Sequence, residues 1–90
     1  MKTYRDMFGN PLTKKDVSLA VQVTAAKQSI TSLALQRSTG FGTGKVNKIL
    51  TLLEDAGIVS KPSESGRSVI IRDQEQATNA SLRLLNRSKK

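Results

Sequence analysis

Residues 43–59 read TGKVNKILTLLEDAGIV, and this stretch decides which fold the whole chain is expected to adopt. Its apolar residues recur at the i, i+3, i+4, i+7 spacing of a helix with one buried face: Val46, Ile49, Leu50, Leu53 and Ala56. Thr43 is expected to cap the start of this helix with its side-chain oxygen. Gly57 stands where a left-handed residue would end the helix, and residues 58–59 then begin an extended segment.

The polar face of this predicted helix divides by charge along its length. The first half carries Lys45, Asn47, Lys48 and Thr51, and the second half carries Glu54 and Asp55. Acids at the end of a helix oppose its macrodipole, so the stability of the helix alone does not explain this order. A helix whose first half approaches phosphates or base edges would explain it. The pattern therefore predicts a recognition helix.

Glycines surround the start of this helix at Gly40, Gly42 and Gly44. The pair Gly44-Lys45 is reminiscent of a nucleotide-binding P-loop, but Val46 occupies the position where that motif needs a metal-binding hydroxyl. Gly40 is also one residue too close to Gly44 for the motif. We therefore reject a P-loop, and expect Gly44 to let a DNA phosphate approach the start of the helix closely.

The composition favours a polyanionic partner. Fifteen Lys and Arg residues against seven Asp and Glu residues give a formal net charge of +8. Nucleic acid is the commonest partner of so basic a small protein, and an acidic membrane surface is a distant second. Aromatic residues are scarce, which disfavours single-stranded RNA and requires a core of Leu, Ile, Val and Ala. Nucleic acid is therefore the expected partner.

The residue types that most enzymes rely on are absent or dispersed. The chain has no Cys and no His, so thiol chemistry, the usual zinc sites and the commonest general base are excluded. Its acids show no metal-site spacing, and no Ser or Thr has a candidate base beside it. We expect no catalytic residues, no cofactor and no bound metal. No apolar run has the length of a membrane span and no signal-peptide core follows Met1, so a cytoplasmic protein without membrane contact is expected.

Upstream of the recognition helix, the sequence predicts two further helices. Residues 1–12 are an N-terminal lead-in that packs on the domain, or an arm that contacts a second subunit or DNA. The T-x-x-D motif at Thr13 and Asp16 resembles a capping box and predicts a helix over residues 14–27. A short strand at residues 29–31 and a second helix over residues 32–38 should follow. Phe41 is expected to fill the angle between the second and third helices.

Downstream, two β-rich runs at residues 58–61 and 67–72 surround a loop that contains Pro62 and Gly66, which predicts an antiparallel hairpin. Lys61 and Arg67 lie at either side of its tip. This order of elements predicts an α+β fold, a winged helix-turn-helix over residues 13–72, in which a three-helix core carries a β-hairpin wing. Residues 73–90 add a C-terminal helix over residues 74–86 and a basic tail. The apolar face of that helix either packs on its own domain or forms a dimer contact.

Three segments together resemble a known module: residues 35–37, the turn at Phe41-Gly42, and residues 53–60, which read LEDAGIVS. The chain is similar to the winged-helix gamma domain of the FtsK and SpoIIIE DNA translocases over about residues 25–71. The resemblance implies binding to short oriented sequences in duplex DNA, without the ATPase motor. That family places Asn-Arg at the start of the recognition helix and a further Arg one turn later, where this chain has Gly44-Lys45 and Lys48. The basic charge is kept but the bidentate donors are lost, so the target sequence does not transfer.

The leading hypothesis is a sequence-specific protein that binds double-stranded DNA. The expected DNA-binding residues are Arg37, Thr43, Gly44, Lys45, Asn47, Lys48, Thr51, Lys61 and Arg67. Asn47 is the best candidate to read adenine, and either the helix or the wing would dominate recognition. We expect an accessory or regulatory factor of a plasmid, mobile element or phage that serves DNA transfer, segregation or transcription control, or else an excised domain.

Two assemblies are expected as alternatives. A homodimer would form through the C-terminal helix or the N-terminal arm, and a larger nucleoprotein complex is a further alternative. The second hypothesis for the function is a protein-interaction module that docks through its C-terminal helix and has only non-specific affinity for DNA. Salt dependence separates the two hypotheses, because only phosphate contacts weaken steeply as salt is added.

Overall fold

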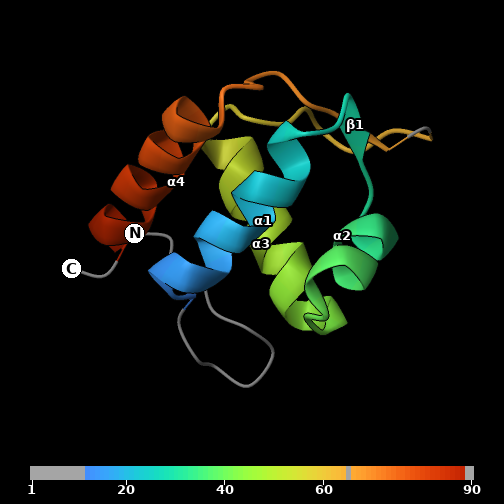
Figure 1. Cartoon of the computed structure of the whole chain (residues 1–90), viewed down its shortest axis with the longest axis horizontal. Helices are drawn as coiled ribbons and strands as arrows, with labels where there is room; N and C mark the ends of the chain where they lie inside the picture. Colours follow the sequence, from blue (N-terminus) through green and yellow to red (C-terminus); the bar gives the residue numbers. More distant parts are fainter. Residues whose placement is uncertain (1–11, 65, 89–90) are drawn as a thin grey trace.

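A computed structural model of the chain describes residues 12–64 and 66–88. It is an α+β domain with four helices and a two-stranded antiparallel sheet among these residues (Figure 1). In chain order the elements are α1 (Lys14–Ala25), β1 (Ser29–Ile30), α2 (Ser32–Thr39), α3 (Thr43–Asp55), β2 (Arg67–Ser68) and α4 (Gln74–Ser88). The predicted class is thus confirmed, and the arrangement is compatible with a winged helix. The predicted lead-in at residues 1–11 and tail at residues 89–90 lie outside the described residues.

Helix α1 begins at the predicted capping box. The Thr13 hydroxyl accepts the Asp16 amide at 3.1 Å, and the Asp16 carboxylate accepts the Thr13 amide at 3.4 Å. These two bonds pair backbone donors that the first turn of a helix otherwise leaves free. The helix ends at Ala25, two residues before the predicted Lys27. Its buried side consists of Val17, Ala20, Val21 and Thr24.

The turn between α2 and α3 differs from the prediction in its cap. Helix α2 is capped by Thr31 and ends at Gly40, whose φ of 77° suits a glycine. The cap of α3 is the extended backbone of Gly42, and no side chain caps this helix. The prediction of Thr43 as the cap is therefore wrong: Thr43 is already helical, and its hydroxyl accepts a hydrogen bond from the Gln36 side chain at 3.2 Å.

Helix α3 buries the predicted face and ends as predicted. Val46, Ile49, Leu50 and Leu53 are buried, Leu52 joins them, and Ala56 is only half-buried. Gly57 follows with φ 80°, and its amide donates to the Glu54 carbonyl. The Ile58 amide donates to the Leu53 carbonyl, which completes a Schellman motif. The chain then turns directly into the extended residues that follow.

The predicted hairpin is present, but its main ladder partner was not predicted. Antiparallel bridges join Val59 to Val69 and Ser63 to Gly66, so residues 59–69 form the hairpin. Between these bridges the first arm has three residues and the second has two, which makes a bulge that includes Pro62. The second arm, β2, pairs instead with β1, in the register Ser29 to Ser68 and Ile30 to Arg67.

The turn of the hairpin packs closely against the corner between β1 and α2. Gly66 has φ 98°, and a Cβ atom there would lie 2.9 Å from Thr31 Cγ2 and 3.0 Å from the Ile30 carbonyl oxygen. Any other residue here would have a strained backbone, and its Cβ atom would clash with Thr31 and the Ile30 carbonyl. Glycine at this position therefore lets the hairpin lie against the rest of the domain.

Helix α4 packs back onto its own domain. Its contacts are with α1 and, less extensively, with α3 (Figure 1). Ala77, Ser81 and Leu85 are buried, and Leu82 and Leu84 pack against the core as half-buried residues. This confirms the first of the two predicted roles for its apolar face. The core consists of Leu, Ile, Val and Ala side chains, as the composition required.

Candidate nucleic-acid interface

The polar surface of α3 is divided into two occupied flanks and one outward stripe. A helix turns about 100° per residue, so positions 44, 48, 51 and 55 form one stripe opposite the buried face. Lys45 lies on the flank that faces α1. Asn47 and Glu54 lie on the flank that faces the hairpin. The two flanks have different neighbours.

On the first flank, Lys45 joins α3 to α1. Its Nζ lies 3.3 Å from the Asp16 carboxylate and 4.8 Å from the centre of the Phe41 ring. The lysine is therefore both ion-paired and placed over an aromatic face, an arrangement that favours a cation. Lys45 was predicted to contact DNA directly. In the structure it holds the start of α3 against α1 and the turn before α3.

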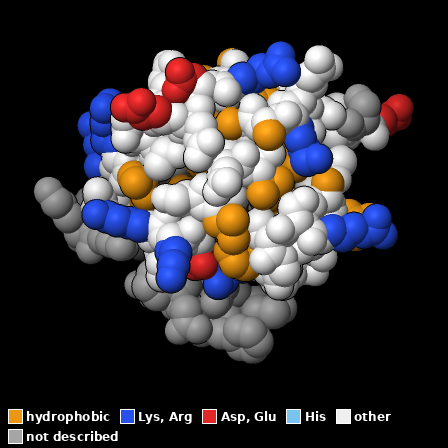
Figure 2. Space-filling model, in the orientation of Figure 1, with side chains coloured by type: hydrophobic (Ala, Val, Ile, Leu, Met, Phe, Trp, Pro, Cys, Tyr) orange, Lys and Arg blue, Asp and Glu red, His pale blue; other side chains and the backbone are white. Residues whose placement is uncertain are grey.

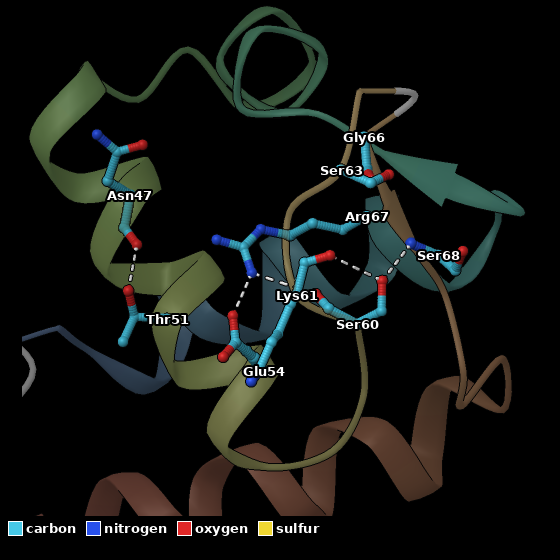
Figure 3. Close-up of polar contacts among 9 residues, drawn as sticks. All are labelled: Asn47, Thr51, Glu54, Ser60, Lys61, Ser63, Gly66, Arg67 and Ser68. Carbon is cyan, nitrogen blue, oxygen red and sulfur yellow. Dashed lines mark hydrogen bonds and ion pairs between the residues drawn. The ribbon is translucent and has the colours of Figure 1, made fainter.

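On the second flank, Arg67 joins the hairpin to α3. Its Nη1 donates to the Glu54 carboxylate at 2.6 Å and to the Ser60 carbonyl at 3.2 Å (Figure 3). The side chains of Arg67 and Glu54 are only 15% and 32% exposed. We call these three residues the hairpin clip. It connects both arms of the hairpin to one helix, so Arg67 has a structural role that its predicted place at the wing tip did not suggest.

The hairpin clip also accounts for the position of Glu54, one of the two acids near the end of α3. Glu54 opposes the macrodipole of its own helix, but its carboxylate forms a short charge-assisted bond with Arg67. The position of this acid is thus explained by packing of the hairpin. In the basic first half of the helix, Lys45 is paired with Asp16, whereas exposed Lys48 has no ion-pair partner among the described residues.

Replacing Arg67 by Gln tests the clip. The change removes the ion pair and leaves Glu54 half-buried without a partner, so the free energy of unfolding should fall by about 1–3 kcal/mol. Lys61 is exposed on the same hairpin, so Lys61→Gln is the matched control and should change stability by less than about 0.5 kcal/mol. Urea denaturation measures both. Equal stability of the two variants would show that the clip contributes nothing to the fold.

The outward part of the interface retains unpaired polar groups. Asn47 and Lys48 are exposed, and no ion pair holds Lys48 within residues 12–64 and 66–88. The Thr51 hydroxyl donates to the Asn47 carbonyl at 3.0 Å, which leaves its oxygen lone pairs available as acceptors (Figure 3). Gly44 is half-buried in the first turn and Thr43 is exposed beside it.

Two further cations flank this outward surface. Arg37 is exposed in the last turn of α2, and Lys61 is exposed on the first arm of the hairpin. Neither forms an ion pair in the part of the chain that the structure describes. Of the five Lys and Arg residues that the sequence analysis selected, Arg37, Lys48 and Lys61 are therefore free to meet an anion, while Lys45 and Arg67 are already paired.

A cleft separates the hairpin from α3. It encloses about 340 Å³ and is walled by Asn47 and Leu50 on α3, by Thr31 and Ser32 at the start of α2, and by hairpin residues that include Pro62 and Ser63. Asn47 thus lies where α3 and the hairpin approach each other. A ligand group that entered the cleft would contact α3 and the hairpin together.

Sequence reasoning selected the cations but missed the acids that hold two of them. Asp16 was assigned only to the capping box, and Glu54 only to the polar face. One available signal was Glu54 itself, because an acid that opposes its helix dipole often has a tertiary partner. No comparable local signal joins Lys45 to Asp16, since the two residues lie on different helices.

Among the described residues, no three His, Cys, Asp or Glu side chains are placed to hold a metal ion. In the same residues, no helix combines the length and the apolar character that a membrane crossing needs.

Comparison with protein-family models, with curated proteins and with solved structures finds no match. The resemblance to the translocase gamma domain therefore remains a prediction.

Proposed function

We propose that this protein is a winged helix that binds double-stranded DNA through the outward stripe of α3, with the hairpin as its wing. The observation that carries the proposal is that the Lys and Arg residues on and around α3 fall into two groups, one paired with acids and one exposed. Lys45 and Arg67 are paired with acids, whereas Lys48, Arg37 and Lys61 are exposed without one within the described residues. Exposed cations gathered around one helix are typical of the electrostatic footprint of a nucleic-acid surface.

The chemistry of the outward stripe suits the major groove. An Asn side chain can bond the N6 and N7 atoms of adenine at once, and exposed Asn47, on the hairpin flank at the edge of the stripe, would do so beside the cleft. Lys48, one residue further along, would meet a phosphate or a guanine edge. Gly44 adds no side chain to the first turn of the stripe, so the DNA backbone can come close there.

The paired residues have a supporting role in this proposal. Lys45 positions the start of α3 against α1, and the hairpin clip positions the wing against the other flank. Lys61 on the wing would then reach the phosphates beside the groove. The helix and the wing act as one rigid unit, because each is fixed to the other rather than only to the core.

Titration of labelled duplex DNA at increasing salt tests the proposal. If Arg37, Lys48 and Lys61 each neutralise one phosphate, log K should fall with log salt with a slope of about −2.7 or steeper, from about −0.9 for each contact. Single-stranded RNA of equal length should bind less tightly, because Phe41 is the one aromatic side chain among the described residues and is half-buried. Failure to bind any duplex from a random pool at low ionic strength would refute the proposal.

A further inference from the structure

The basic residues of α1 and α4 that the proposed groove contact does not use lie near one end of the domain. Lys14 and Lys15 open α1, Arg87 lies in the last turn of α4, and Arg83 lies one turn earlier. All four are exposed. We call them the basic band. Figure 1 shows α1 and α4 running in opposite directions, so that the start of α1 is beside the end of α4.

The basic band adjoins the proposed DNA surface on the side away from the hairpin. Asp16 follows Lys15 directly, and its carboxylate contacts Lys45 in the first turns of α3 at 3.3 Å. Lys45 and the hairpin clip lie on opposite flanks of α3. The start of α1 is therefore on one side of the recognition helix and the hairpin is on the other. Figure 2 shows Lys and Arg side chains along the lower left margin, over the start of α1 and the end of α4.

The two lysines of the band have no explanation within the domain. Cations in the first turn of a helix oppose its macrodipole, so Lys14 and Lys15 cost helix stability rather than add to it. Neither forms an ion pair with a described residue, and the adjacent acid Asp16 is engaged with Lys45. Arg87 differs, because a cation at the end of a helix is favoured. A ligand outside the domain would explain the two lysines, and the two arginines extend the same positive surface.

We infer that the basic band binds the phosphate backbone of the DNA that flanks the recognition site, on the side opposite the wing. The inference rests on the proposed function and extends its footprint. The wing, the outward stripe of α3 and the band would then contact three successive parts of one duplex. The domain is 33 Å along its longest axis, which is about one turn of the double helix, so contacts at both of its ends reach beyond the groove that α3 occupies.

The chemistry of the band suits a duplex backbone rather than bases. Its side chains are ammonium and guanidinium groups, which recognise phosphates without reading sequence. None of the four is aromatic, so the band offers no platform for stacking unpaired bases. A duplex whose backbone passes the start of α1 supplies the evenly spaced anions that such a surface fits.

Flank truncation combined with substitution tests the inference. A duplex selected from a random pool is shortened on one side of the site at a time, and affinity is measured for the wild-type protein and for Lys14→Ala/Lys15→Ala. We expect one flank to matter for the wild type and to lose its effect in the double variant. The variant's salt slope should be smaller by up to about 1.8, for two contacts at about 0.9 each. Addition of Arg83→Ala/Arg87→Ala should reduce the slope further.

Lys27→Ala/Arg72→Ala is the matched control. It removes the same charge from exposed residues just after α1 and just before α4, at the opposite ends of these two helices. This control should keep the flank effect and most of the salt slope. Thermal unfolding followed by circular dichroism should show that the band variant is at least as stable as the wild type, because its substitutions remove charges that oppose the α1 dipole.

The outcomes separate the inference from the function on which it rests. If the wild type binds no duplex, the proposed function fails and the inference fails with it. If the wild type binds but the band variant keeps the same flank effect and salt slope, the inference alone is overturned. If the control pair weakens binding as much as the band pair, the effect is one of net charge and the band is not a contact surface.

Discussion

Replacing both Asn47 and Lys48 by Ala is expected to weaken binding to the selected duplex by at least about 2 kcal/mol, which is about thirtyfold. Both side chains are exposed on the outer surface of α3. Loss of Asn47 should also relax the preference for adenine at one position, whereas loss of Lys48 should lower the salt slope if it contacts a phosphate. Competition between matched and mismatched duplexes measures the first effect, and titration at several salt concentrations measures the second.

The control for this pair removes the same two chemical groups elsewhere. Asn79 on α4 and Lys27 after α1 are exposed, so Asn79→Ala/Lys27→Ala changes the charge and composition equally. This variant should bind within about threefold of the wild type, because it removes only long-range attraction that salt screens. Equal weakening by the two double variants would contradict our placement of α3 in the groove.

Replacing Leu53 by Ala is expected to lower the free energy of unfolding by about 2–5 kcal/mol. Leu53 is fully buried in α3, and its carbonyl accepts the amides of Ile58 and Val59, where the chain enters the hairpin. Truncation of its side chain leaves a cavity beneath the recognition helix. A domain of this size has only about 5–15 kcal/mol of total stability, so the variant should unfold at a much lower urea concentration.

Leu33→Ala provides the comparison for Leu53. Leu33 lies in the first turn of α2 and is 53% exposed, so its truncation removes little buried surface. The change in unfolding free energy should stay within about 0.5 kcal/mol. If the two leucine variants were equally stable in urea, the buried face assigned to α3 would be wrong.

The parts of the fold that sequence could predict are those with local chemical signals. The capping box at Thr13 and the glycine stop at Gly57 each need only a few neighbouring residues, and both are confirmed. The α3 cap was wrong because Gly42 and Thr43 are both acceptable cap residues, and only the backbone geometry decides between them. The partner of β2 could not be predicted, because β1 has two residues and such a strand shows no periodic pattern.

The candidate site was predictable as a set of charges but not as a set of contacts. Charge order along residues 43–59 predicts which surface of α3 carries the candidate site, since it depends only on helical spacing. Which cations stay free depends on distances between elements that are remote in the chain. Lys45 meets an acid 29 positions earlier (45 minus 16), and Arg67 meets one 13 positions earlier (67 minus 54). Neither spacing has a sequence signature.

The division of the α3 surface limits how the protein can be redirected to a new target. Randomising Lys45 or Glu54 would break links to α1 or the hairpin, so substitutions there would lower stability as well as change any preference. Gly44, Asn47, Lys48 and Thr51 do not carry such links between elements. A library confined to these four codons is small enough to screen exhaustively, and natural drift in target preference should be concentrated at the same places.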